Sequence, residues 1–184
     1  MPAIIDLPLP YVDRLPERSS EAVTLVVIHC TELPDLATAR EYGEKVLYES
    51  GAGNSGHYYI DRDGTILRYV PGTRVAHHVR GRNADSIGIE LVNRGRYPNW
   101  FVAGNQTMGE PYPQVQVEAL RTLLVQLRQE FPNLRAIAGH EDLDTARVPA
   151  SDDPAVMVPR KLDPGPLFPW VAIVPACGLE RVRA

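Results

Sequence analysis

The chain is predicted to fold as a single α/β domain with a mixed central β-sheet flanked by α-helices. Short apolar, β-branched runs alternate with two stretches of helical periodicity, and an Asp-Gly step joins two strand-like runs. The 184 residues are enough for one sizeable core. Hydrophobic residues make up 44% of the chain and charged residues 23%, as in ordinary globular proteins.

The first half of the chain contains a strand followed by a helix. Residues 23–28 form a continuous apolar, β-branched run, which is typical of a buried strand. Residues 36–47 carry apolar side chains at helical spacing, with Asp35 as the expected N-cap and Gly51 as the stop signal. We therefore expect one amphipathic helix to follow the first strand.

A hairpin and another strand come next. The runs 57–60 and 65–70 flank a turn whose Asp-Gly step, at 63–64, is the strongest short hairpin signal. Residues 86–92 are expected to form a strand with two different faces. One face would carry Ile87, Ile89 and Leu91, and the other Gly88 and Glu90.

The second half predicts one long helix and a short strand. Apolar residues recur at helical spacing over 117–131, in a helix expected to open near Pro113. Residues 135–138 are expected to form the final strand. The two long connections, 93–112 and 141–160, are expected to be functional walls or disordered insertions.

Charge and composition exclude several classes of protein. The net charge of −4 argues against a nucleic-acid binder, and no apolar run approaches the ~18 residues of a membrane span. The N-terminus lacks a signal-peptide pattern, and two cysteines, Cys30 and Cys177, make no disulfide framework. We expect a cytoplasmic protein in a reducing compartment, and we favour a monomer.

Two histidines at strand ends and one distant aspartate form a candidate catalytic zinc site. His29 ends the first apolar run, His140 follows the last one, and Asp163 precedes Pro-Gly-Pro. Two imidazoles and one carboxylate leave a fourth zinc position open, as in hydrolytic sites. Each residue alone has a plainer interpretation, because a lone strand-end histidine is more often a core residue and the aspartate can simply cap a turn.

Several short motifs occur in the order of a known family. With them, from about Val23 to Trp170, the chain resembles the AmpD-type zinc-dependent N-acetylmuramoyl-L-alanine amidases. Their fold superfamily includes phage amidase lysozymes and peptidoglycan recognition proteins. The matching pieces are Val27-Ile28-His29-Cys30-Thr31, the segment Gly56 to Gly64, Ser86-Ile87-Gly88-Ile89-Glu90-Leu91, Gly139-His140 and Lys161-Leu162-Asp163-Pro164-Gly165-Pro166.

The resemblance implies a role for each of five residues. His29, His140 and Asp163 would bind one Zn²⁺ per chain. Glu90 would orient the attacking water and accept its proton, although a strand carboxylate paired with an arginine is the alternative. Lys161 would stabilise the oxyanion, although a solvated surface lysine is the alternative.

Substrate contacts are expected at four further positions. His78 resembles a family histidine in the loop before the Glu90 strand, and its neighbour His77 competes for that match. Arg80, Asn93 and Trp100 complete the set. Six arginines between residues 68 and 96 favour an anionic ligand such as a stem peptide, with a solvated basic loop as the alternative for each one: Arg68, Arg74, Arg80, Arg82, Arg94 and Arg96.

The sequence also differs from parts of the family. Gly56 stands where some phage and recognition-protein relatives place a catalytic tyrosine, which AmpD-type members lack as well. Residues 145–159 resemble an insertion between the second and third expected ligands. We divide the chain into an N-terminal extension (1–22), a zinc amidase domain (23–170) and a C-terminal tail (171–184).

The function implied is hydrolysis of the amide bond between N-acetylmuramic acid and L-alanine in peptidoglycan or muropeptides. The alternatives are a catalytically silent peptidoglycan-binding module and a phage endolysin, released from an infected cell, with an additional protein-binding role. An ordinary metallopeptidase is disfavoured because the sequence has no His-Glu-x-x-His stretch.

Overall fold

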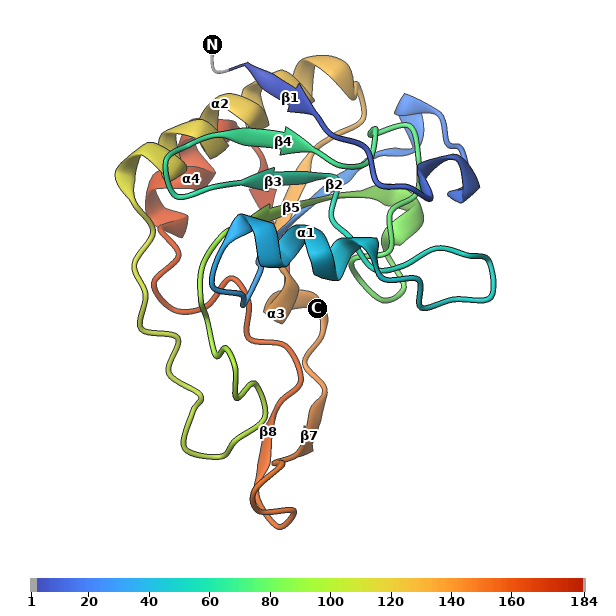
Figure 1. The fold of residues 1–184 in the computed structure, drawn as a ribbon. Coiled ribbons are helices and arrows are strands. Elements are labelled where there is room, and N and C mark those ends of the chain that lie inside the picture. Colours follow the sequence, from blue (N-terminus) through green and yellow to red (C-terminus); the bar gives the residue numbers. More distant parts are fainter. Residues whose placement is uncertain (1–2, 184) are drawn as a thin grey trace.

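A seven-stranded mixed sheet forms the centre of the computed structural model, which describes residues 3–183 (Figure 1). The strand order is β1-β4-β3-β5-β2-β6-β9. Strands β3, β5, β2, β6 and β9 are parallel to one another, β4 is antiparallel to β3, and β1 is parallel to β4. The strands are β1 (Ile4–Asp6), β2 (Leu25–Cys30), β3 (Tyr58–Ile60), β4 (Ile66–Arg68), β5 (Ser86–Leu91), β6 (Ala136–Gly139) and β9 (Glu180–Arg181).

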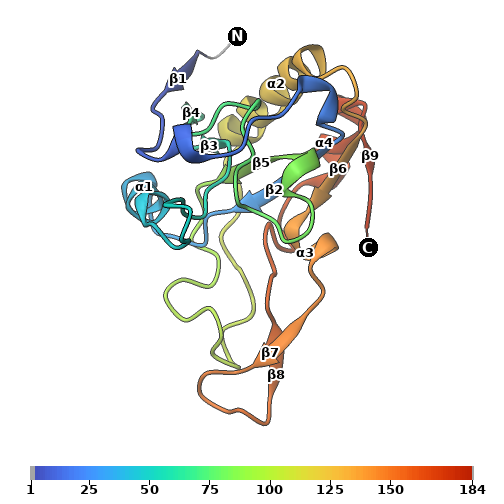
Figure 2. The same cartoon turned by 90° about the vertical axis from the view of Figure 1, so that its right-hand side faces the viewer.

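Helices cover both faces of the sheet, as the predicted fold class requires. Helix α1 (Leu36–Glu44) lies on one face, and α2 (Gln114–Glu130) and α4 (Trp170–Cys177) lie on the other (Figures 1 and 2). The short helix α3 (His140–Leu143) follows β6 directly. Single 3₁₀ turns occupy Val12–Arg14, Ser20–Ala22 and Asn83–Asp85.

The alternation predicted for β5 is confirmed. Ile87, Ile89 and Leu91 are fully buried in the main core, which lies between the sheet and the face of α2. The opposite face of the strand carries Gly88 and Glu90. Because side chains alternate along a strand, the same parity places His29 of β2 beside Glu90 rather than in the main core.

Helix α1 begins where the sequence predicts and ends earlier. Asp35 caps it, accepting a hydrogen bond from the backbone amide of Thr38 at 2.7 Å. The helix ends at Glu44 and not at residue 47, because the backbone amides of Leu47 and Tyr48 both donate to the carbonyl of Ala52 instead of to helical acceptors.

Both ends of the described chain join the sheet. Strand β1 extends it beside β4, and β9 extends it beside β6, so the expectation that residues 135–138 form the final strand is wrong. The predicted division at residues 22 and 170 stays a prediction, and residues 1, 2 and 184 lie outside the described part. Within 3–22 and 171–183, the structure adds a packed N-terminal segment, most of α4 and β9.

The two long connections pack against each other and project from the sheet (Figures 1 and 2). The later one contains an antiparallel hairpin of β7 (Arg147–Pro149) and β8 (Met157–Pro159). The amide of Ser151 donates to the carbonyl of Phe101, and the amide of Ala103 donates to Asp152 Oδ1, each at 2.8 Å. We call loop 93–112 and this hairpin together the paired wall.

No helix among residues 3–183 has the length and apolar character needed to cross a bilayer.

Candidate active site

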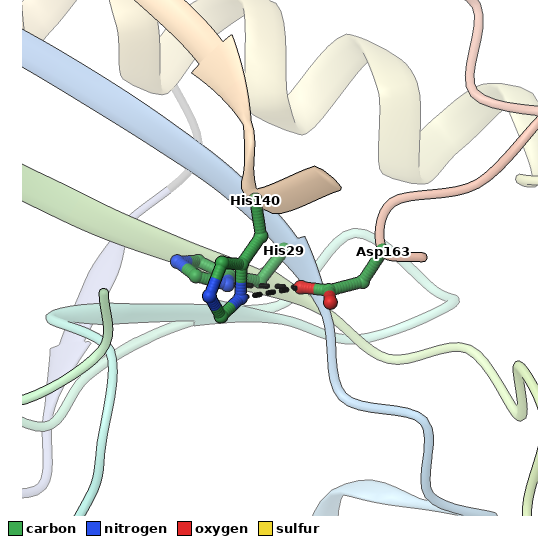
Figure 3. A group of neighbouring side chains, drawn as sticks. All are labelled: His29, His140 and Asp163. Atoms are coloured by element: carbon green, nitrogen blue, oxygen red, sulfur yellow. Dashed lines mark hydrogen bonds and ion pairs between the residues drawn. The ribbon is translucent and has the colours of Figure 1, made fainter. Parts of the chain in front are cut away.

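The register of the parallel strands brings the two strand-end histidines together. Ile28 of β2 pairs with Gly139 of β6, so His29 and His140, the next residue in each case, leave the sheet at the same level. Asp163 reaches the same point from the loop that follows β8. The three residues come from segments far apart in the sequence and meet at the carboxyl edge of the sheet (Figure 3).

One carboxylate oxygen faces both imidazoles. Asp163 Oδ2 lies 3.0 Å from His29 Nδ1 and 3.1 Å from His140 Nδ1. One ligand atom from each of the three residues lies within 4.8 Å of the other two. The side chains are buried, with exposed fractions of 2% for His29 and 3% for both His140 and Asp163, and the second oxygen, Asp163 Oδ1, is buried without a hydrogen-bond partner.

These donors fit a zinc ion by their chemistry. Two imidazole nitrogens and a carboxylate oxygen are a ligand set of catalytic zinc sites. Burying a carboxylate oxygen without a partner is costly, and a bound cation would remove that cost. Among residues 3–183, no other group of three histidine, cysteine or acidic side chains is placed to hold a metal.

The loop that carries Asp163 is fixed by backbone contacts. The amide of Glu141, next to His140, donates to the carbonyl of Asp163 at 2.9 Å, and the Tyr112 hydroxyl donates to the carbonyl of Pro164 at 2.7 Å. Gly139 is required here because it has no side chain, and not because of an unusual backbone conformation. Its φ of −80° is ordinary, but a Cβ there would lie 2.9 Å from Pro164 Cδ.

Burial and neighbouring charges shift the pKa values of His29 and Asp163. Burial, reinforced by His140, lowers the pKa of His29 to about 4 against the opposing effect of Asp163. Burial alone would raise the pKa of Asp163, but the neighbouring histidines hold it well below its usual range. At neutral pH the site therefore offers a carboxylate and a neutral His29 imidazole, which is the state that binds a cation.

Glu90 lies beside the trio, where the sequence expects it. It pairs in register with His29 across β2 and β5, and its Oε1 lies 4.0 Å from His29 Nδ1. Burial, followed by the Asp163 carboxylate, raises the pKa of Glu90 to about 8, and Lys161 opposes the shift. Gly56 leaves Glu90 its space, because a Cβ at Gly56 would lie 2.8 Å from Glu90 Cγ.

A cleft of about 730 Å³ opens above these residues, and Glu90 and Lys161 both line it. Lys161 is partly exposed and belongs to the cleft lining. The five residues that the sequence singled out for metal binding and catalysis are thus together in one cavity.

The four expected substrate contacts separate into two groups. Arg80 is exposed on the cleft, and Trp100 lines it while its indole Nε1 donates to the carbonyl of Glu32 at 3.1 Å. Asn93 is only 2% exposed, lies outside the cleft lining, and uses its amide on Gly95 and Glu110. His78 borders the cleft and contacts His29. The substrate contacts expected of Asn93 and His78 stay predictions.

The arginine-rich segment does not form one anionic-ligand surface. Arg96 is 1% exposed and makes a two-point ion pair with Glu32, at 2.7 and 2.8 Å, which joins the paired wall to the end of β2. The arginines that pair with carboxylates are Arg68 with Asp6, Arg74 with Glu17, Arg82 with Asp85, and Arg96 with Glu32. Sequence reasoning missed this buried ion pair, because Glu32 lies outside every motif.

Three side chains placed to hold a metal meet at the carboxyl edge of an α/β sheet, under an open cleft lined by a carboxylate and a lysine. This arrangement is typical of hydrolases that use a metal ion. The family model for N-acetylmuramoyl-L-alanine amidases matches residues 19–166. The chain therefore belongs to the N-acetylmuramoyl-L-alanine amidase family, and its resemblance to AmpD-type members is confirmed.

Individual relatives cover the chain to different extents. The 1,6-anhydro-N-acetylmuramyl-L-alanine amidase AmpD of Escherichia coli K12 is 29% identical over 190 residues, which cover 89% of this chain and 86% of that protein. An endolysin of Klebsiella phage KP32 is 32% identical over 88 residues, so the match spans 46% of this chain and about half, 52%, of that relative. The structure of AmpDh3 from Pseudomonas aeruginosa with an anhydromuramic pentapeptide has a TM-score of 0.66 at 26% identity, covering 87% of this chain and 61% of that one.

Proposed function

We propose that this chain is a zinc-dependent amidase that hydrolyses the bond between N-acetylmuramic acid and L-alanine, with zinc held by His29, His140 and Asp163. One observation carries the proposal: Asp163 faces both Nδ1 atoms through one oxygen, while its other buried oxygen has no partner. A bound zinc ion supplies Lewis acidity, which polarises a carbonyl and acidifies water.

Glu90 is the proton carrier in this proposal. A cation held by the trio would favour the ionised form of Glu90 over the protonated form that burial favours. This carboxylate borders the trio and opens onto the cleft, so Oε1 is placed to take a proton from the attacking water. The same atom then returns that proton to the nitrogen of the leaving L-alanine, because an amide nitrogen leaves as an amine only when it is protonated. Partial burial excludes most competing water from this transfer.

Lys161 stabilises the charge that develops on the carbonyl oxygen of the substrate. Lys161 lines the cleft, and its charge acts on both His29 and Glu90. An ammonium aimed at an oxyanion stabilises the tetrahedral stage more than the neutral amide. Arg80 and Trp100, on the cleft walls, are proposed to contact the stem peptide and the sugar.

Soluble 1,6-anhydro-muropeptides are the proposed substrate, because AmpD of Escherichia coli, whose name specifies them, matches 89% of this chain. We extend this proposal to a cytoplasmic setting, in which such fragments are soluble. The endolysin match covers about half of that relative, and it makes intact sacculi the competing substrate to test.

Digestion of defined muropeptides, followed by mass spectrometry, tests the function. Zinc-loaded protein is expected to release the free stem peptide from anhydro-muropeptides faster than from sacculi, and chelation is expected to stop release until zinc is restored. Asp163→Ala is expected to lose stoichiometric zinc, whereas Asp152→Ala, on the hairpin, keeps it. Intact muramoyl-L-alanine bonds after incubation with zinc-loaded protein would remove the enzymatic proposal.

A further inference from the structure

His29 makes a second contact that the proposed chemistry does not use. Its Nε2 points away from Asp163 (Figure 3) and lies 3.0 Å from Nδ1 of His78, with the two rings edge to face at 88°. The chain of contacts continues from His78 Nε2 to Ser86 Oγ at 3.1 Å, and Ser86 Oγ donates to the carbonyl of Arg82 at 2.6 Å.

The backbone carbonyl of Arg82, at the end of this series of hydrogen bonds, sets their direction. A backbone carbonyl only accepts, so the Ser86 hydroxyl proton is used on Arg82 and Ser86 Oγ accepts from His78 Nε2–H. A neutral His78 protonated on Nε2 has a lone pair on Nδ1, which accepts from His29 Nε2–H. His29 is then left with its lone pair on Nδ1, the nitrogen that faces Asp163. The opposite direction would take the short Ser86 hydrogen bond away from Arg82.

His78 is held in place from two sides. Its ring packs over Gly88, where a Cβ would lie 2.6 Å from His78 Cγ. The ring therefore fits only because Gly88 has no side chain. Asn83 Oδ1 accepts from the backbone amides of both His78 and Val79, at 3.0 and 2.8 Å, which fixes the loop that presents the ring. Both contacts keep His78 Nδ1 directed at His29.

We propose that His78 and Ser86 are positioning residues for the proposed metal ligand His29. They hold its proton on Nε2 and present its Nδ1 lone pair to the site. This inference rests on the zinc site of the proposed function. Partners of this kind orient a ligating imidazole and fix its tautomer, and their loss typically costs about 10- to 100-fold in metal affinity. The substrate contact expected of His78, which also lines the cleft, stays a prediction.

Zinc affinity, measured by competition with a chromogenic chelator, tests the role. Ser86→Ala and His78→Leu are expected to weaken zinc binding by about 10- to 100-fold. His78→Asn, whose Oδ1 can accept near the place of Nδ1, is expected to recover most of the affinity. His77→Leu is the matched control, because the ring of His77 meets Tyr48 edge to face and not His29, and this variant is expected to bind zinc as the wild type does.

The outcomes separate positioning from packing. Wild-type affinity in both Ser86→Ala and His78→Leu would overturn the proposal, as would His78→Asn being as weak as His78→Leu. If His78→Leu fails to fold, Ser86→Ala and the tautomer measurement decide.

Long-range ¹H–¹⁵N correlation spectra give the second readout. His78 is expected to be protonated on Nε2 in the wild type, and a proton on Nδ1 would overturn the proposed direction. A wild type that binds no zinc would overturn the metal site, while the His78 spectrum would still report the direction of the hydrogen-bond chain.

Discussion

His29 and Glu90 are register partners on the adjacent parallel strands β2 and β5, and 4.0 Å separates His29 Nδ1 from Glu90 Oε1. The backbone ladder therefore sets the distance between a proposed ligand and the proposed proton carrier. Neither residue depends on a loop for its place, because both belong to paired strands at the centre of the sheet.

Glu90→Gln is expected to lower kcat by about 10²- to 10⁴-fold, because the amide keeps the shape of the carboxylate but cannot accept the proton. Zinc stoichiometry should be unchanged, since Glu90 is not a proposed ligand. Steady-state kinetics on an anhydro-muropeptide and metal analysis measure the two quantities. Glu118→Gln, on the exposed face of α2, is the control, and a Glu90→Gln enzyme with wild-type kcat would remove the assigned role.

Arg96→Met is expected to destabilise the fold by about 3–5 kcal/mol, because it leaves the Glu32 carboxylate buried without its partner. Equilibrium unfolding in urea measures the loss. Arg68→Met breaks the more exposed ion pair with Asp6 and is expected to cost less than about 1 kcal/mol. Equal losses of unfolding free energy in the two variants would contradict the claim that the buried ion pair matters more than the exposed one.

Arg80→Ala is expected to raise KM for a stem-bearing muropeptide by about tenfold or more, with kcat nearly unchanged. Arg80 is exposed on the cleft and makes no ion pair within the described chain, so its guanidinium is available to a substrate carboxylate, and such charge-assisted bonds are worth about 1.5–3 kcal/mol. Arg94→Ala, exposed outside the cleft lining, should leave KM at its wild-type value. An unchanged KM in Arg80→Ala would exclude the contact.

Acid is expected to destabilise the fold through His57. Burial, followed by the nearby Arg18 guanidinium, lowers its pKa to about 3, and its Nδ1 accepts the amide of Gly88 at 3.0 Å. The ring of His78 also faces it. Below pH ~6.5, His57 is protonated in the unfolded chain but stays neutral in the folded chain. The free energy of unfolding therefore falls by about 1.4 kcal/mol per pH unit until the pH reaches the pKa of His57 in the folded chain.

His57→Asn keeps an acceptor for Gly88 and removes this titration, so its stability should depend less steeply on pH between 6.5 and 4 than that of the wild type. Urea unfolding at several pH values gives both slopes. Identical slopes would show that His57 is not the group responsible.

Much of the site was predictable because it is attached to regular strands. His29, Glu90 and His140 each belong to or directly follow a strand whose apolar pattern is visible in the sequence, and parallel strands end at one edge. Asp163 was predictable only through the Lys-x-Asp-Pro-Gly-Pro motif of the family. No periodicity places a loop residue beside a strand end more than a hundred residues away.

The features that sequence reasoning missed depend on contacts between irregular segments. Strands β1 and β9 contain three and two residues, too few for a period-2 pattern to appear. The pairing of Arg96 with Glu32 joins two loops, so nothing distinguished Arg96 from its neighbours Arg80 and Arg94. The role of His78 depends on which nitrogen faces His29, and this is a property of orientation that a sequence does not encode locally.

The paired wall has a consequence for how this protein can diverge. Its two segments leave the sheet after different strands, yet each satisfies backbone amides of the other, through Ser151 on Phe101 and Ala103 on Asp152. Shortening one segment alone would leave hydrogen-bonding groups of the other without partners, so changes of length should occur in both segments together during evolution. Transplanting both segments as one cassette would then alter the cleft wall, to which Arg96, Trp100 and Phe101 contribute, while leaving the strand ends in place.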